Sequence, residues 1–221
     1  MESRHFELIE PKDVIKFYIN LYNGERKNIT TRLFKGESEI NIESLLPKDY
    51  YAFKNHDEDI IGYLQNNNVE LFMKEINKVY HTRVKLEKID FQNVFPTIDS
   101  IKEMDVNKFI EKLHGITSHY EYSFATKVFN FIEPNVCPVL DSVSVSLLKR
   151  YFEQSKLARS GWGNYDNYKE DYMQFCEEFG LNNYTLKEVD VFLWTYGKVI
   201  EKYWTEIGVI RFDNQSYSLK K

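Results

Sequence analysis

Residues 123–142, SFATKVFNFIEPNVCPVLDS, contain the features on which the fold and the candidate site depend. Apolar residues recur at helical spacing before the first proline, and Pro134 and Pro138 then interrupt the helix and stiffen the loop. Asp141 precedes a second run with helical apolar spacing, SVSVSLLKRY. The stretch predicts a helix that carries Lys127, a proline-broken loop, and a helix that begins after Asp141.

Two side chains of this stretch each have two interpretations. On a helical wheel at about 100° per residue, Lys127 lies on the shoulder of the apolar face, one turn before Phe131. A lysine there either extends its amine to water or keeps its stem buried and its amine at a cleft. Asp141 is a favoured N-cap, and a carboxylate fixed at a helix N-terminus can also stabilise developing positive charge. The local sequence leaves both pairs of interpretations open.

The rest of the chain favours helices. Nine glycines and five prolines in 221 residues are few for a sandwich or barrel, which needs many turns. Residues 30–42 lack helical spacing and predict a small extended region. We therefore expect an all-α array over residues 1–221, as a single domain or as two helical subdomains that flank an active-site cleft. Helical spacing is clearest in 11–25, 68–83, 105–116, 142–156, 165–180 and 185–204, where Thr185 and Glu188 form a capping-box pattern and Gly115 and Gly180 are expected helix stops.

Charge and cysteine content exclude several classes of protein. A formal net charge of −5 and a pI near 5.6 argue against a strongly basic nucleic-acid-binding chain, although local basic segments permit DNA binding. Cys137 and Cys176 are too few for a disulfide scaffold, and no two histidines have the i, i+4 spacing of a helical metal site. The sequence has no apolar run resembling a secretion signal or a membrane span. We expect a reduced cytoplasmic protein, without metal or cofactor, that is monomeric.

The order of these features resembles the helix-hairpin-helix DNA glycosylase superfamily, especially the bacterial proteins similar to 8-oxoguanine DNA glycosylase. The similarity covers roughly residues 106–150: helix, tight turn, helix with TKV, proline loop, and PVLDS opening a helix. It implies that Lys127 is the nucleophile that attacks the sugar C1′ and that Asp141 assists it. It also implies that Phe131 lies against a base flipped out of double-stranded DNA.

The hairpin differs from the family pattern. That pattern has a glycine-rich turn whose amides hold a DNA phosphate, whereas no glycine lies between Gly115 and Lys127. The phosphate contact is therefore expected to be weaker or to come from other groups. The basic residues Lys149, Arg150, Lys156 and Arg159 are candidates for binding phosphates, and a solvated helix end is the alternative explanation for them.

Three functions remain open on the sequence. The first is a glycosylase that excises a damaged or modified base, 8-oxoguanine-like by resemblance, with accompanying lyase activity at the abasic (AP) site, as in base excision DNA repair. The second is a monofunctional glycosylase acting on another modified base, for example on phage DNA in defence, in which Asp141 activates water. The third is a non-catalytic helical module that binds DNA or protein, which the acidic charge and the missing hairpin glycines favour.

Overall fold

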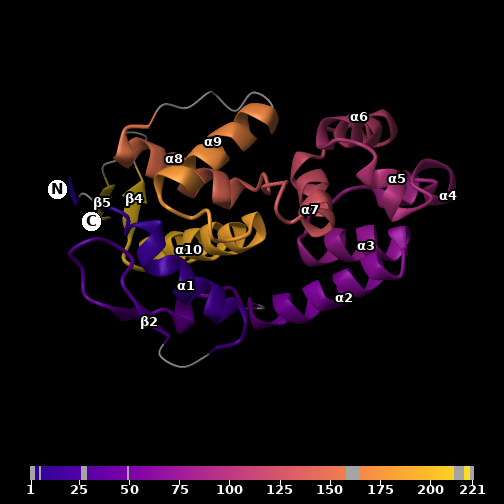
Figure 1. The fold of residues 1–221 in the computed structure, drawn as a ribbon. Helices are drawn as coiled ribbons and strands as arrows, with labels where there is room; N and C mark the ends of the chain where they lie inside the picture. Colours follow the sequence, from indigo (N-terminus) through magenta and orange to yellow (C-terminus); the bar gives the residue numbers. More distant parts are fainter. Residues whose placement is uncertain are drawn as a thin grey trace.

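The computed structural model describes residues 3–4, 6–25, 29–48, 50–157, 165–211 and 217–219, and helices dominate this part of the chain (Figure 1). The expected all-α class is confirmed. The α-helices are α1 (Pro11–Tyr22), α2 (Phe53–Gln65), α3 (Val69–Val79), α4 (Phe91–Val94), α5 (Ile98–Lys102), α6 (Val106–Thr117), α7 (Tyr122–Ile132), α8 (Ser142–Ser155), α9 (Tyr165–Glu178) and α10 (Leu186–Glu206). Short 3₁₀ turns η1 (Glu43–Leu45), η2 (Tyr50–Ala52) and η3 (Leu86–Lys88) lie between them.

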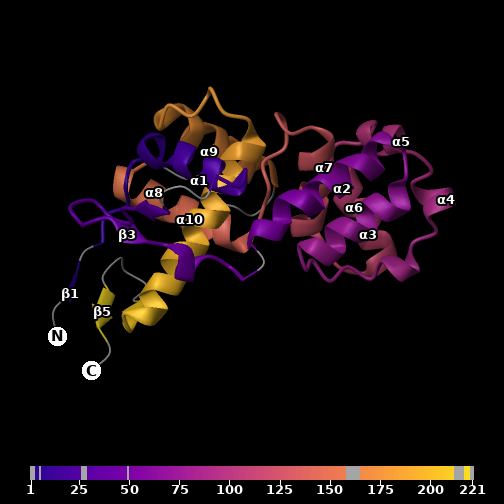
Figure 2. The ribbon, with the colours of Figure 1, turned by 90° about the horizontal axis from the view of Figure 1, so that it is seen from below.

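Two small antiparallel sheets complete the fold. Strands β2 (Thr30–Thr31) and β3 (Ile40–Asn41) pair within the extended region expected at 30–42. The second sheet, in the order β1 (Ser3–Arg4), β5 (Tyr217–Leu219) and β4 (Val209–Arg211), joins segments from the two ends of the sequence. Figure 2 shows the chain ends close together at this sheet.

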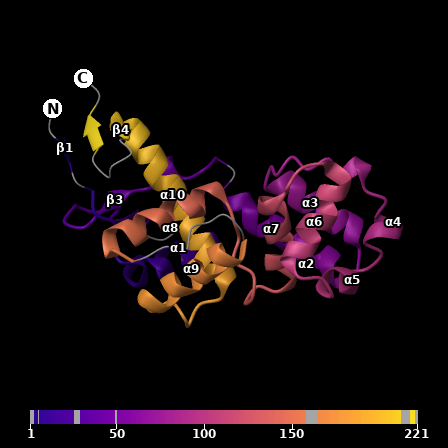
Figure 3. The same ribbon diagram turned by 90° about the horizontal axis from the view of Figure 1, so that it is seen from above.

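The helices form two lobes (Figures 1 and 3). We call α2–α7 the first lobe, and α1, α8, α9 and α10 with the sheets the second lobe. Helix α7 lies at the side of the first lobe that faces the second, and the proline loop runs from α7 across to the start of α8. This placement brings the two ends of the 123–142 stretch to the boundary between the lobes.

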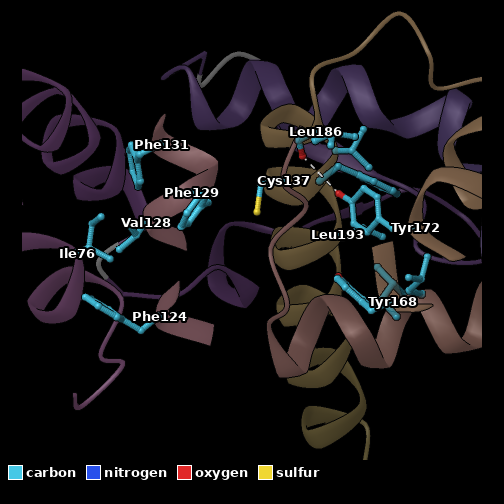
Figure 4. Close-up of a cluster of buried hydrophobic side chains, with 14 of the residues drawn as sticks. Ile76, Phe124, Val128, Phe129, Phe131, Cys137, Tyr168, Tyr172, Leu186 and Leu193 are labelled. Carbon is cyan, nitrogen blue, oxygen red and sulfur yellow. Dashed lines mark hydrogen bonds between the residues drawn. The ribbon is translucent and has the colours of Figure 1, made fainter. Parts of the chain in front are cut away.

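Helix α7 is buried on more of its circumference than its apolar face predicts. Phe124, Val128 and Phe129 point into the first lobe, as Figure 4 shows. Cys137 lies on the segment of chain that leads from this lobe to the buried tyrosines of the second lobe. The opposite side of α7 is covered by the proline loop. There Thr126 accepts a hydrogen bond from the Leu140 amide (3.0 Å), and Asn130 donates one to the Cys137 carbonyl (2.8 Å).

Local capping follows the sequence at several helix ends. Asp105 accepts the Lys108 amide at 2.8 Å to begin α6, and both capping-box hydrogen bonds between Thr185 and Glu188 form at the start of α10. The expected stop of α6 at Gly115 is wrong, because the helix continues to Thr117 and Ser118 adopts the left-handed conformation. A serine therefore ends the helix where a glycine is usual.

The second lobe depends on a close approach of α8 and α10. A Cβ atom added at Gly197 of α10 would lie 2.6 Å from Cγ1 of Val143, in the first turn of α8. Only glycine permits the present separation without movement of Val143. Because Asp141 caps this same turn of α8, the packing at Gly197 positions the Asp141 carboxylate.

Candidate functional site

A pocket with a volume of about 50 Å³ lies between the two lobes. Its lining from the first lobe comes from α2, the end of α3 and α7, and its lining from the second lobe comes from α1, the proline loop, Asp141 and α10. The lining residues are Tyr22, Phe53, Asp57, Tyr80, Lys127, Asn130, Phe131, Val139, Asp141, Lys187, Asp190, Val191, Trp194 and Thr195. Three of them are among the residues singled out from the sequence as candidates for catalysis or base binding, namely Lys127, Phe131 and Asp141.

Lys127 and Asp141 form an ion pair in this pocket. The Lys127 Nζ lies 3.2 Å from Oδ2 of Asp141 and also donates to Oγ of Ser123 at 2.9 Å. Only 8% of the Lys127 side chain is exposed, so the interpretation in which its amine extends to water is wrong. The cause is the boundary position of α7, where the second lobe covers the shoulder of the helix.

Asp141 holds the ion pair and the helix cap at once. Its Oδ1 accepts the Val143 amide at 2.9 Å, while Oδ2 faces Lys127. The two interpretations of Asp141 are therefore compatible, because one oxygen serves each. An N-cap carboxylate is held in place by the backbone, and its negative charge interacts favourably with the helix dipole.

Asp190 is a third acidic group of the pocket that the sequence analysis missed. Burial raises its pKa to about 7, with Lys127 opposing the shift and Asp141 adding to it, and Ser144 donates a hydrogen bond to Oδ1 at 3.1 Å. It lies one turn after Lys187 on α10. A carboxyl with this pKa can take up or release a proton near neutral pH. The only signal in the sequence was an aspartate between Val189 and Val191, among the residues that repeat at core spacing.

A second lysine–aspartate pair faces the same pocket and was also missed. Asp57 of α2 accepts hydrogen bonds from Tyr22 and from Tyr80 (2.5 Å), and it forms an ion pair with Nζ of Lys187 (2.8 Å). Burial and the neighbouring Asp57 raise the pKa of both phenols, so both tyrosines donate as neutral groups. These residues come from three helices and a turn, and nothing in the local sequence connects them.

Phe131 lines the pocket but its ring is already in contact with a charge. The Lys187 Nζ lies 3.8 Å from the centroid of the Phe131 ring, and Phe72 and Tyr80 pack against the same ring. A base stacked on the face under Lys187 requires that lysine to move. Trp194, which packs edge-on against Phe53, is a further aromatic wall of the pocket. The base-stacking role of Phe131 stays a prediction.

The four predicted phosphate ligands are placed differently from one another. Lys149 and Lys156 are exposed on α8, but Lys156 at its C-terminal end is on the order of 20 Å along the helix from Asp141. Arg150 is buried, with its guanidinium carbon 4.3 Å from the Trp204 ring centroid, so the structure contradicts a phosphate contact for it. The cause is its position on the face of α8 that packs on α10. Arg159 lies outside the described residues.

Comparisons and searches add no further assignment. The sequence matches no protein-family model and no curated protein, and the fold matches no solved structure. Within the described residues, no group of three or more His, Cys, Asp or Glu side chains has an arrangement suited to a metal ion, and no helix is long and apolar enough to cross a membrane.

Proposed function

We propose that the protein is a DNA glycosylase that removes a damaged or modified base and forms a Schiff base with the sugar through Lys127. The observation that carries the proposal is the ion pair of 3.2 Å between Lys127 and the helix-capping Asp141, in a pocket between two lobes. The resemblance of the 106–150 segment to helix-hairpin-helix glycosylases assigns the same two residues. Aromatic side chains line this pocket, and a base flipped out of a duplex can stack on such side chains.

In the proposed reaction, the bond between C1′ and the base nitrogen breaks, and its electron pair leaves with the base, which takes up a proton. The Asp141 carboxylate stabilises the positive charge that develops on the sugar. The lone pair of neutral Lys127 forms the new bond to C1′. The resulting secondary ammonium loses a proton, and opening of the sugar ring places a proton on O4′ and leaves an imine.

The proposed reaction needs a group that accepts the proton of Lys127, and we assign this role to the carboxyl groups of the pocket, including Asp190. Lys127 attacks only as a neutral amine, so its proton must leave before the new bond forms. Asp190, with a pKa of about 7, and Asp141 are the two carboxyl groups that act on Lys127 electrostatically or directly. Lyase activity follows if the imine loses a proton from C2′ and the 3′ phosphate departs with the electrons of the C3′–O bond.

Reductive trapping tests the proposal without knowledge of the base. A duplex that contains one preformed abasic site is incubated with the protein and borohydride, which reduces an imine to a stable amine. We expect a covalent adduct for the wild type and for Lys74→Gln, a control that removes an exposed lysine on α3, and none for Lys127→Gln. A mass-spectrometric screen of bases released from varied DNAs then identifies the substrate.

The monofunctional alternative predicts a different pattern. If Asp141 activates water and Lys127 only contacts phosphate, base release occurs without any borohydride adduct. A non-catalytic module predicts neither adduct nor released base. Base release by Asp141→Asn at the wild-type rate contradicts both catalytic alternatives, because Asn preserves the helix cap but not the charge.

A further inference from the structure

The hairpin between α6 and α7 has little to attract a phosphate. No lysine or arginine lies between Lys112 and Lys127, and Glu121 adds a negative charge. The turn has no glycine, and its exposed aromatic Tyr120 stacks on His114 with a centroid distance of 3.9 Å. If DNA binds over the pocket, positive charge from another element must meet its backbone.

The turn of residues 80–85, which follows α3, begins at the wall of the pocket. It begins at Tyr80, whose hydroxyl lies in the pocket on Asp57. The next side chains alternate in exposure: His81, Arg83 and Lys85 are exposed, whereas Val84 is buried. The chain therefore leaves the pocket and presents its basic residues on the surface beside it.

Asn77 holds this turn in a fixed shape. Its side chain accepts the Val84 amide (2.9 Å) and the Thr82 hydroxyl (2.7 Å), and it donates to the Val84 carbonyl (3.0 Å). His81 and Arg83 adopt positive φ values of 49° and 61°, which cost about 1 kcal/mol or more each for residues other than glycine. Such a conformation persists only where its surroundings hold it, and here Asn77 does so.

The outward groups of the turn are without partners in the described part of the chain. The backbone N–H groups of His81, Arg83 and Lys85 donate no hydrogen bond there, and the side chains of Arg83 and Lys85 form no ion pair. Arg83, Lys85 and Lys88 with Glu87 give a local surplus of two positive charges in a chain whose net charge is −5. Alternating free amides and cations on a rigid turn suit an anion.

We propose that the turn of residues 80–85 binds backbone phosphates of the duplex beside the pocket, in place of the hairpin between α6 and α7. Arg83 and Lys85 are the principal ligands, and Asn77 is a positioning residue. The choice of a duplex as the source of the phosphate depends on the proposed glycosylase function. The turn lies on the surface of the first lobe, so DNA held there and by the second lobe spans the pocket mouth.

Salt dependence of binding tests this directly. For a duplex with an abasic-site analogue, the logarithm of the binding constant falls with the logarithm of salt concentration, by about 0.9 for each neutralised phosphate. We expect Arg83→Gln/Lys85→Gln to lower this slope by about 2 and to weaken binding ten- to a hundredfold near 0.15 M salt. The matched control is Lys12→Gln/Lys16→Gln, which removes two exposed charges from α1 and should change the slope by less than about 0.5.

Two further arms identify the source of the phosphate and separate the two proposals. Replacing chloride by inorganic phosphate at equal ionic strength should leave wild-type affinity for the duplex within about twofold. A much larger loss of affinity assigns the turn to free phosphate and contradicts the proposal that it binds the phosphates of a duplex. Lys127→Gln should keep the wild-type slope while losing the borohydride adduct. An unchanged slope in Arg83→Gln/Lys85→Gln, with trapping intact in the wild type, overturns this inference and leaves the glycosylase proposal standing. A lowered slope in Arg83→Gln/Lys85→Gln, with no trapping in the wild type, supports phosphate binding by the turn and contradicts the glycosylase proposal.

Discussion

The pocket contains two lysine–aspartate pairs that are alike in composition and opposite in environment. In the pair of Lys127 and Asp141, the lysine is the more buried partner, with 8% of its side chain exposed against 18% for the aspartate. In the pair of Lys187 and Asp57 the order is reversed, with 24% of the lysine and 7% of the aspartate exposed. The more buried member of each pair depends on partners within the protein for its polar atoms.

The hydrogen bonds of the two aspartates differ in the same sense. Asp57 accepts hydrogen bonds from two tyrosines and is paired with a lysine, so most of its acceptor capacity is used within the protein. Asp141 accepts one backbone amide and faces Lys127, which leaves capacity directed at the pocket. We infer that the Asp57 pair organises the pocket wall, and the proposed chemistry falls to the Asp141 pair.

The largest expected difference is between the two lysines. At a preformed abasic site, Lys127→Gln should lower the rate of borohydride trapping by at least about a thousandfold, because the nucleophile is lost. Lys187→Gln should lower the trapping rate by less than about tenfold, because an abasic site has no base for the pocket to hold. Single-turnover trapping with excess protein measures both, and equal losses would contradict the division of roles.

Replacing Asp57 should reduce the stability of the fold more than replacing Asp141. Asp57→Asn leaves three donors facing a side chain that cannot accept all of them, so the free energy of unfolding should fall by about 2 to 4 kcal/mol. Asp141→Asn should cost less than about 1 kcal/mol, because Asn is an equally good N-cap. Urea denaturation followed by circular dichroism measures the free energy of unfolding of both variants. A larger loss of stability for Asp141→Asn than for Asp57→Asn contradicts the structural role given to Asp57.

Gly197 connects helix packing to only one of the pairs. Gly197→Ala places a Cβ 2.6 Å from Cγ1 of Val143, so the Val143 side chain or the first turn of α8 must shift, at a cost of about 1 to 3 kcal/mol. The shift moves Asp141 with the first turn of α8, and trapping should slow while the Asp57 cluster is unaffected. Val143→Ala in the same background removes the clashing atom, and recovery of trapping confirms the cause.

Asp190 gives the smallest effect and a defined pH window. Its pKa is raised from an ordinary 3.8 to about 7, so between about pH 4 and 7 the folded protein binds a proton that the unfolded chain has released. The free energy of unfolding should therefore fall as pH rises through this window. In Asp190→Asn this decrease should be smaller by on the order of 1 to 3 kcal/mol, and parallel curves for the two proteins exclude the shift.

The sequence predicts those parts of the fold that depend on local interactions. Helical spacing, the Asp105 cap and the Thr185–Glu188 capping box depend on residues within one or two turns, and the structure confirms them. Gly115 failed as a stop because a left-handed serine three residues later satisfies the same helix end. The sheet that joins β1 with β4 and β5 had no local signal, since its partners lie about 200 residues apart.

The candidate site was predictable only where two neighbouring segments form it. Lys127 and Asp141 are 14 residues apart and joined by a stiff loop, so their order along the chain was informative. Asp57, Lys187 and Asp190 are brought together by packing of the two lobes, which helical spacing does not encode. Arg150 was misassigned because a basic residue in a charged run was taken for a surface residue, whereas its guanidinium packs on Trp204.

Peptide mapping of the borohydride adduct tests the central claim most directly. The wild-type protein is trapped on a duplex with one abasic site, digested with protease and nuclease, and the modified lysine is located by mass spectrometry. The proposed mechanism predicts that the sugar remnant is attached to Lys127 in the segment SFATKVFNF. Attachment to Lys187 or to exposed lysines, with Lys127 unmodified, would contradict it.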